Sequence, residues 1–480
     1  MSDKQSSKMF YLWVMLVLVL LMTIGMYFLP AEVAGIPLKS SDILSELRVE
    51  TPQDGDMLVA DGEGDIEEDE APKRVEDASA RIKADSIRNV RKRDSIYSIL
   101  VAERAKVDTA VVAENVLFED FSPGHTGLKS IFEALRRRGQ MDKPIYIAAL
   151  GDSFIEGDIF TLDVRRLLQQ RYGGGGVGWM PMYSQVSGYR QGVKQRSKGW
   201  KETTILNKSK SPLPLSGRLF RAQGQASVEY TLDESPVAGN SVTRLYYAAK
   251  DELNVRYTAG DSTMNITLPA ADPIGEYTFP ISSDKVGFSV QSDAEAATFF
   301  GMSLETDQGV VLDNYSLRGN SGIPLGSLDA DMGSSLNADR PYHLIILQYG
   351  LNVASAKQKN YRSYGNTMIK VVRRLQELFP QASILIMGIS DRGVRVSGQF
   401  VTMPSIPDFI AEQRRVAQET GVVFWDTYAA MQSLGGINGF VSKGWAAKDY
   451  THMSFKGGRR LAEEMLKAFD FEDKYYEALL

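Results

Sequence analysis

Two stretches of the chain alternate short apolar runs with helix-like periodicity. Residues 144–150 form an uninterrupted apolar run, and a helical pattern follows over residues 159–172. The alternation returns later, with strands expected at residues 343–349, 383–388 and 422–425 and helices at 361–379, 408–420 and 455–469. A strand that is apolar at every position is typical of burial on both faces, and strands alternating with helices indicate a parallel, doubly wound α/β sheet.

Residues 186–311, between these two stretches, follow a different pattern. They show no helical periodicity, but short runs such as residues 227–232 and 286–290 alternate apolar and polar positions. Turn residues separate the runs at spacings typical of a β-sandwich or jelly roll. We therefore expect an all-β domain inserted into an α/β domain whose two parts are residues 115–185 and 312–480.

The N-terminal region contains a longer apolar run. Residues 9–29 carry no charge, and at 1.5 Å per residue they just span a hydrocarbon core of about 30 Å. The run is longer than the apolar part of a signal peptide, and the sequence after Pro30 fits a small-x-small cleavage motif poorly. An uncleaved transmembrane anchor is therefore expected, with a cleaved signal peptide as the alternative. Because Lys4 and Lys8 precede the run, residues 1–8 are expected in the cytoplasm and the catalytic part in the periplasm or outside the cell.

Residues 30–114 are expected to link this anchor to the folded part. Nine acidic residues and no basic ones lie between Asp54 and Glu70, a composition that buries too little apolar surface to repay ordering entropy. We expect a flexible tether there. Residues 75–107 mix apolar positions with many charges, as in a charged helix. Such a helix either pairs with a second copy of the chain or stands alone as a solvated stalk.

The amino-acid composition argues against several classes of protein function. With 43% hydrophobic and 24% charged residues, the 480-residue chain is close to the average for a folded protein, and a net charge of −6 argues against nucleic-acid binding. The absence of cysteine excludes disulfides, thiolate metal sites and a cysteine nucleophile. Only three histidines are present, and a zinc enzyme that relies mainly on histidine ligands would need nearly all of them, so a catalytic metal is not expected. No cofactor is expected either.

Candidate chemistry follows two of the expected strands. Gly151, Asp152 and Ser153 end the first strand, and Gly350-x-Asn352 ends the strand of the next repeat. Ligands of open α/β sheets bind beyond the carboxyl ends of the strands, where backbone amides can face a developing anion. Each motif alone has a plainer interpretation, because small polar residues commonly end strands and stabilise their own loops.

A third candidate lies near the C-terminus, where Asp449 precedes His452 by three residues. At this spacing in a turn, the carboxylate can reach the inner nitrogen of the imidazole. It would fix the tautomer and stabilise the imidazolium, as the aspartate of a serine hydrolase does. Taken alone, such a pair more often stabilises a loop than takes part in catalysis.

Together these motifs resemble the SGNH (GDSL) hydrolase family, whose four blocks appear here in order. The four matching segments are residues 151–153, 318–322 (Arg-Gly-Asn-Ser-Gly), 350–352 and 449–452. The resemblance covers about residues 115–185 and 312–480. The Gly-x-Ser-x-Gly elbow of the other large α/β esterase fold is absent.

The resemblance implies a role for each block. It implies a catalytic triad of Ser153, Asp449 and His452, an oxyanion hole of the Ser153 and Gly322 amides with the Asn352 side chain, and supporting roles for Gly151, Asp152 and Gly350. His452 would accept the proton of Ser153, which forms an acyl-serine that water hydrolyses. Because only neutral imidazole accepts a proton, activity is expected to fall below about pH 6.

A narrower resemblance is to peptidoglycan O-acetylesterases. Gly157 and Asp158 follow Ser153 at the spacing of those enzymes, which also carry a carbohydrate-binding-like β domain between their first and second blocks. Phe154 departs from the pattern, because the family often has histidine there. The glycine-rich residues 173–178 are interpreted as a loop that brings Trp179 to the rim of the site, or as a purely structural turn.

The function expected is removal of O-acetyl groups from a cell-envelope glycan, above all peptidoglycan. An O-acetyltransferase acting on an envelope polysaccharide would need the same residues, and a lipase- or thioesterase-like hydrolase is another alternative. A membrane-tethered glycan-binding protein with a vestigial hydrolase fold is the alternative from a different class of function.

Overall fold

The computed structural model describes residues 116–207, 211–233, 239–290 and 296–479, together with residues 32–33 and 36–37. The predicted anchor at residues 9–29 and the predicted charged helix at residues 75–107 lie outside the described residues. Within the described ranges, no helix is both long enough and apolar enough to cross a membrane. In the N-terminal unit, β1 (Glu32–Val33) and β2 (Ile36–Pro37) pair antiparallel.

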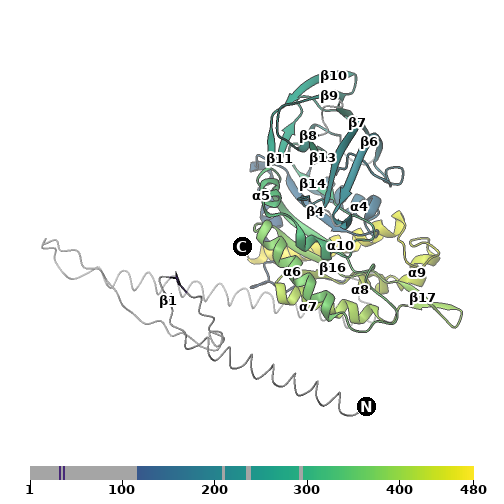
Figure 1. The fold of residues 1–480 in the computed structure, drawn as a ribbon. Coiled ribbons are helices and arrows are strands. Elements are labelled where there is room, and N and C mark those ends of the chain that lie inside the picture. Colours follow the sequence, from purple (N-terminus) through teal and green to yellow (C-terminus); the bar gives the residue numbers. More distant parts are fainter. Residues whose placement is uncertain are drawn as a thin grey trace, which may run out of the picture. The chain divides into compact units, whose positions relative to one another are not determined.

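The α/β part is built on a six-stranded sheet (Figure 1). In spatial order its strands are β14 (Val310–Asn314), β4 (Ile145–Gly151), β15 (Tyr342–Gln348), β16 (Ser383–Met387), β19 (Val423–Trp425) and β3 (Glu119–Asp120). The first five strands are parallel, and β3 pairs antiparallel with β19. Every residue of β4 is buried, as expected for a strand covered on both faces.

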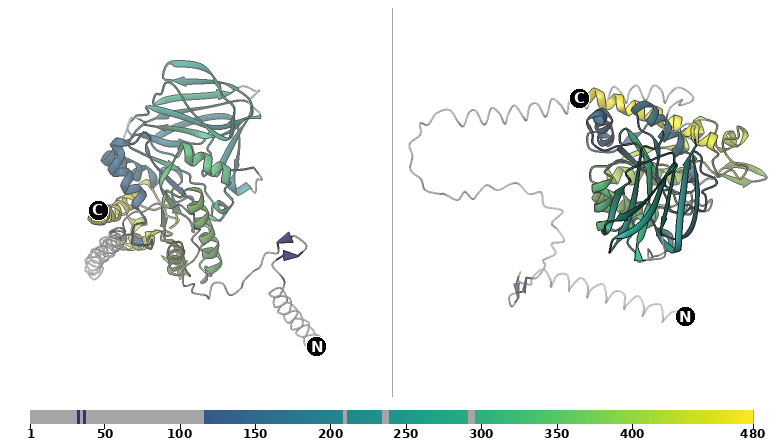
Figure 2. Two further views of the ribbon diagram at one scale, coloured as in Figure 1. Left: turned by 90° about the vertical axis from the view of Figure 1, so that its left-hand side faces the viewer. Right: turned by 90° about the horizontal axis from the view of Figure 1, so that it is seen from above.

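Helices cover both faces of this sheet. The layer on one face contains α3 (Lys129–Arg137), α4 (Thr161–Tyr172) and α10 (Phe455–Leu479), and the other contains α5 (Ala330–Asp339), α6 (Arg362–Leu378) and α7 (Ile406–Thr420). Figure 2 shows the two groups on opposite sides of the sheet. Short helices complete the fold: α8 (Thr427–Ser433), α9 (Gly436–Ser442), and the 3-10 turns η2 (Arg138–Gln140), η3 (Glu156–Asp158), η4 (Ile205–Asn207) and η6 (Ile323–Ser327).

A nine-stranded antiparallel sheet forms the β domain. Seven of its strands follow one another in space in the order β10 (Ser262–Leu268), β9 (Leu253–Ala259), β12 (Lys285–Val290), β7 (Arg218–Leu232), β13 (Thr298–Glu305), β8 (Val242–Ala249) and β11 (Ala271–Thr278). Two further strands, β5 (Gly176–Met180) and β6 (Val193–Thr204), pair with β13 and β7.

The structure places the edges of the β domain differently from the sequence analysis. The antiparallel sheet already includes β5, which ends before residue 186, whereas β14 starts at Val310 and belongs to the parallel sheet. Both strands are short and fully buried, so their composition does not reveal which sheet they join. The last helix also continues ten residues beyond the expected end at residue 469, to Leu479.

A buried ion-pair cluster joins the two sheets. Arg340, at the end of α5, is fully buried and donates to Asp313 of β14 at 2.6 and 2.7 Å. The same guanidinium lies 2.8 Å from Glu305 of β13 and 4.0 Å from the ring centre of Tyr146. A buried charge is tolerated only when it is paired, so this cluster fixes the β domain against the sheet that carries the predicted nucleophile.

Candidate active site

Ser153 lies at the carboxyl end of β4, at the start of a turn that we call the nucleophile turn (residues 151–158). Asp152 is completely buried, and its Oδ1 accepts the amide of Phe154 at 2.9 Å. Burial raises the pKa of Asp152 to about 7, although this amide and the side chain of Asn352 act in the opposite direction. The carboxyl of Asp152 therefore shapes the turn, while Ser153 itself is only partly buried.

A line of hydrogen bonds connects three of the four motifs. The side-chain nitrogen of Asn352 donates to Asp152 Oδ2 at 3.0 Å and to the carbonyl of Asn320 at 3.1 Å. The Oδ1 of Asn320 in turn accepts the amide of Gly322 at 3.0 Å. The first, second and third motifs thus meet at one edge of the parallel sheet, as their positions after the strands predict.

Asp449 and His452 form the pair expected from their spacing. Asp449 Oδ2 lies 2.7 Å from His452 Nδ1, and its Oδ1 accepts the amides of Thr451 and His452, each at 3.0 Å. Partial burial acts to raise the pKa of Asp449, but these hydrogen bonds outweigh it and hold the pKa below its usual value. An ionised Asp449 keeps the Nδ1 proton in place and leaves Nε2 available as a base.

Close packing brings this histidine loop (residues 446–454) to the nucleophile turn. A Cβ at Gly458, in the first turn of α10, would lie only 1.8 Å from the carbonyl oxygen of Ile159. The helix that follows His452 therefore contacts the backbone directly after the nucleophile turn. His452 is also close enough to act electrostatically on Asp152. No hydrogen bond joins Ser153 to His452 within the described ranges; in structures without substrate, such contacts are often longer than in the reacting complex.

A hairpin that the sequence analysis missed supports the histidine loop. It consists of β17 (Gly393–Val396) and β18 (Gln399–Thr402). The ring of Phe400 stacks on Tyr450 with centroids 3.7 Å apart and planes 9° apart, and the Gly393 amide donates to the Tyr450 carbonyl at 2.8 Å. Tyr450 lies between Asp449 and His452, so the hairpin helps to set the geometry of the pair.

The structure adds a condition to the predicted oxyanion donors. The Gly322 amide donates to Asn320 Oδ1 at 3.0 Å, so it must release this bond to hold an oxyanion. The two acceptors of Asn352 account for both N–H groups of its side chain, so Asn352 must release one of them to bind an oxyanion. Among the described residues, the amides of Ser153 and Gly319 donate to no acceptor.

Gly319 lies in the turn that follows β14. The chain after β14 continues alongside β4, with the Tyr315 amide bound to the Ala149 carbonyl at 2.8 Å and the Leu317 amide to the Gly151 carbonyl at 2.9 Å. This pattern ends at Leu317, whose carbonyl accepts the Asn320 amide at 3.1 Å, so Gly319 lies in an exposed turn. Gly319 has a φ of 76°, which favours glycine, and no atom lies within 4 Å of a Cβ placed there.

A second buried ion cluster lies under the nucleophile turn. Asp158 is completely buried and accepts from Arg165 at 3.0 Å and from Arg190 at 2.8 Å. Burial acts to raise the pKa of Asp158, but the two guanidinium charges outweigh it and hold the pKa well below its usual value. Asn314 of β14 and Thr161 of α4 also donate to Asp158, each at 2.7 Å. Asp158, which follows Gly157 in the narrower motif, therefore anchors the nucleophile turn to the buried core.

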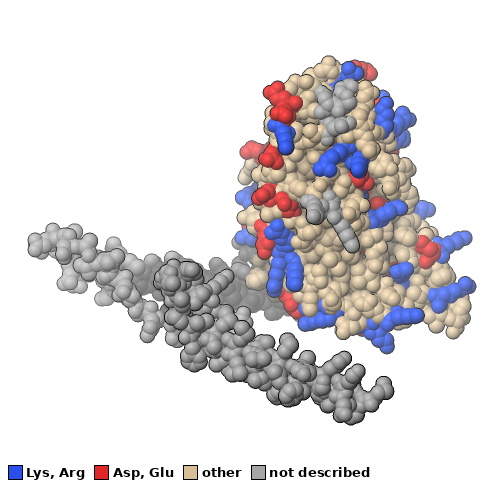
Figure 3. Space-filling model, in the orientation of Figure 1, with Lys and Arg blue, Asp and Glu red and all other residues tan. Residues whose placement is uncertain are grey.

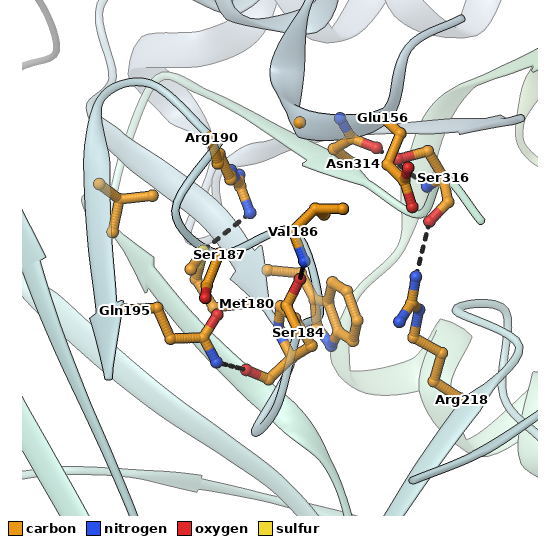
Figure 4. Close-up of a pocket in the computed structure, with 14 residues that line it drawn as sticks. Glu156, Met180, Ser184, Val186, Ser187, Arg190, Gln195, Arg218, Asn314 and Ser316 are labelled. Carbon is orange, nitrogen blue, oxygen red and sulfur yellow. Dashed lines mark hydrogen bonds between the residues drawn. The ribbon is translucent and has the colours of Figure 1, made fainter. Parts of the chain in front are cut away.

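The pocket nearest to this cluster is too small for a sugar. It has a volume of about 40 Å³, and Figure 4 shows Arg190 on one side of it and Glu156 and Arg218 on the other. A space of this size holds only a few water molecules. Trp179, which also lines it, is 4% exposed and donates its Nε1 proton to the Phe300 carbonyl at 2.9 Å. Of the two interpretations of the glycine-rich run before Trp179, the structure supports the structural turn.

Comparisons with known proteins identify solved structures that resemble this chain. No family model matches the chain, and no curated protein does. Among solved structures, a peptidoglycan O-acetylesterase superposes with a TM-score of 0.61 at 22% identity, over 75% of this chain and 99% of the other. A family two carbohydrate esterase from Cellvibrio japonicus also matches, at 11% identity, a TM-score of 0.25, and coverage of 59% of this chain and 99% of the other. The described part of the chain has the fold of the SGNH (GDSL) hydrolases.

Proposed function

We propose that this protein is a serine esterase that removes O-acetyl groups from a cell-envelope glycan, with peptidoglycan as the preferred substrate. One observation carries the proposal: an ionised Asp449 orients His452 beside a strand-end turn that presents Ser153. The likeness to a solved peptidoglycan O-acetylesterase, which extends over the β domain as well, supports the choice of substrate.

The reaction follows from the roles of the residues. His452 accepts the proton of Ser153 Oγ as this oxygen attacks the acetyl carbonyl, and the imidazolium then protonates the departing sugar hydroxyl. A water molecule, deprotonated by the same imidazole, attacks the acetyl-serine. The bond between the acetyl carbon and Ser153 Oγ breaks, the imidazolium returns its proton to this oxygen, and acetate leaves. Asp449 stabilises the imidazolium in both steps.

The charge on the carbonyl oxygen needs donors that are free when it develops. The Ser153 amide fits this requirement. The Gly322 amide joins it when it releases Asn320, and the Asn352 side chain when it releases Asp152 or Asn320. Removing one donor of this kind typically slows a hydrolase by about 10²–10³-fold. Replacement of Asn352 by alanine tests the side chain without touching the backbone donors.

The direct test is acetate release from O-acetylated peptidoglycan by the full-length chain, compared with Ser153→Ala. Release by the wild type and none by the variant supports the proposal. If acetate appears only when a second polysaccharide is present as acceptor, and appears on that acceptor, the chain is a transferase. Ser153-dependent hydrolysis of small acyl esters alone would favour a lipase- or thioesterase-like enzyme. Inactivity towards all of these substrates would favour the glycan-binding alternative.

We also propose that residues 9–29 anchor the chain in the cytoplasmic membrane, with residues 1–8 inside and the catalytic domain in the periplasm. The length of the apolar run and the lysines before it support this orientation. Self-association through residues 75–107 is a further proposal. Carbonate extraction of membranes tests the first, and the mass of the chain in solution before and after deletion of residues 75–107 tests the second.

A further inference from the structure

A large groove opens next to the proposed catalytic residues. It has a volume of about 810 Å³ and is lined by the loop before β6, by the start of β6 and by the facing sides of α4 and α10. Phe455, three residues after His452, is one of its lining residues, and its ring lies 5.4 Å from that of Tyr189. Tyr189 also covers Gly157 of the nucleophile turn, where a Cβ would lie 2.8 Å from its ring. The groove therefore lies beside the nucleophile turn and the start of α10.

Positive charge dominates this groove. Of the described residues that line it, five are cationic and one is acidic: Arg166, Arg190, Lys194, Arg196 and Arg459 against Asp233. We call it the basic groove. A local excess of this kind contrasts with the net charge of −6 of the whole chain. In Figure 3, lysine and arginine side chains follow the side of the molecule on which Figure 1 draws β6.

The nearby carboxylates do not neutralise this charge. Asp158 is shared between Arg165 and Arg190, and Asp163 is shared between Arg166 at 3.5 Å and Arg459 at 3.1 Å. Lys194 has its own partner, Asp233, at 3.0 Å. When Arg165, Asp158 and Asp163 are added to the lining residues, the groove and its immediate surroundings contain six cations and three carboxylates. Arg196 is exposed and forms no ion pair with any residue that the structure describes.

The positive surface continues along β6, away from the active site. Lys194, Arg196 and Lys198 occupy alternate, exposed positions of this strand and so point to the same face. Beyond them, a second hollow of about 390 Å³ is lined by three cations, Arg196, Lys198 and Arg256, and by one carboxylate, Glu229, which lies opposite Arg196 on β7. Regularly spaced cations along a groove beside the nucleophile turn suit a polymer with anionic groups at intervals, because its charges are attracted from solution and held in sequence.

We propose that the basic groove is a subsite for carboxylate groups carried by the glycan substrate, such as those of the peptide side chains of peptidoglycan. This inference rests on the proposed function and deepens it. The groove would hold a charged part of the polymer while the acetyl group of a neighbouring sugar lies at Ser153. Arg196 and Arg459 stand on opposite sides of the groove and provide exposed guanidinium groups for carboxylate binding.

The experiment compares two forms of one substrate. O-acetylated peptidoglycan is divided, and in one half the carboxylates are converted to amides, so that size and acetylation stay the same while charge is lost. We expect the full-length wild type to prefer the charged form by about tenfold in kcat/KM, a preference that salt reduces. Arg196→Gln/Arg459→Gln should abolish most of this preference. Arg196→Gln alone, which breaks no ion pair among the described residues, should reduce it part of the way.

The matched control removes two positive charges elsewhere. Lys370 and Arg373 are exposed on α6, in the helix layer on the opposite face of the sheet, and Lys370→Gln/Arg373→Gln should keep the wild-type preference. Equal kcat/KM for both substrate forms in the wild type would overturn the subsite. Loss of the preference in the control as strongly as in the groove variant would also overturn it.

A binding measurement separates failure of the subsite from failure of the proposed function. Soluble fragments of the charged and the amidated glycan are titrated onto Ser153→Ala and onto Ser153→Ala/Arg196→Gln/Arg459→Gln. Binding of the charged fragments that the groove substitutions weaken supports the subsite even if the wild type releases no acetate. Equal binding of both fragments by both variants would overturn the subsite and leave any measured acetate release unaffected.

Discussion

The nucleophile turn and the histidine loop differ in how deeply they are buried. In the turn, Asp152 and Asp158 are completely buried, and Asp158 is held by two arginines, whereas the side chains of Asp449 and His452 are 50% and 57% exposed. The turn belongs to the core that the two sheets share. The loop depends on a few hydrogen bonds, one stacked ring pair and the close packing of α10. Substitutions of the buried carboxylates in the turn should therefore act mainly on folding, and substitutions of the exposed pair in the loop mainly on catalysis.

The largest expected effect is on catalysis through Asp449. Asp449→Asn should lower kcat by about 10⁴-fold, because an amide no longer fixes the correct tautomer of His452 or stabilises its charge. Since the pair is half exposed, the free energy of unfolding should change by less than about 1 kcal/mol. Ester hydrolysis and urea unfolding of the same preparation measure both quantities. If unfolding of the variant accounted for its loss of activity, the expected difference between the turn and the loop would be wrong.

The next effect is on folding through Asp158. Asp158→Asn leaves Arg165 and Arg190 without their buried counter-charge, and breaking such a pair costs about 3–5 kcal/mol. Urea unfolding should show this loss directly. Asp163→Asn serves as the comparison, because Asp163 is also buried but its two arginines are partly exposed to water, so a smaller loss is expected. Equal losses for the two variants would contradict the account of the turn.

A smaller effect is expected from the titration of Asp152. Its pKa is about 7 in the folded chain, above the usual value of about 3.9 for an aspartic acid. The folded state therefore binds an extra proton, and this group contributes stability that is complete below about pH 4 and is lost as the pH rises towards 7. Thermal unfolding of Asp152→Asn should lose this part of the pH dependence. An unchanged pH dependence in the variant would contradict the assignment.

The smallest effect is expected from the hairpin. Phe400→Ala removes the ring that stacks on Tyr450 and should lower kcat by about tenfold with little change in KM, because a small displacement of a catalytic group is costly. Phe400→Tyr, which keeps the ring, should restore most of the rate. Val401→Ala in the same hairpin is the control, since Val401 is 39% exposed. If Val401→Ala slowed the reaction as much as Phe400→Ala, the stacking would not be the cause.

The sequence predicts the parts of this protein that depend on local patterns. The apolar run of β4 and the Asp449–His452 spacing predict a buried strand and a paired histidine, and both are found. The hairpin escapes prediction because its importance comes from a contact between Phe400 and Tyr450, fifty residues apart.

The second motif shows the same limit. The Gly322 amide donates to Asn320 Oδ1, two residues earlier, and this contact depends on the conformation of the turn and not on residue type alone. Similarly, β5 is apolar enough for either sheet, and only its pairing with β13 assigns it.

The most direct test of the central claim is covalent labelling of Ser153 by a fluorophosphonate, which reacts with activated serines and needs no knowledge of the natural substrate. We expect a single adduct, mapped to Ser153 by mass spectrometry, with labelling slowed strongly in Asp449→Asn and abolished in Ser153→Ala. Labelling at another serine, or at Ser153 with the same rate in Asp449→Asn, would contradict a triad formed by Ser153, His452 and Asp449.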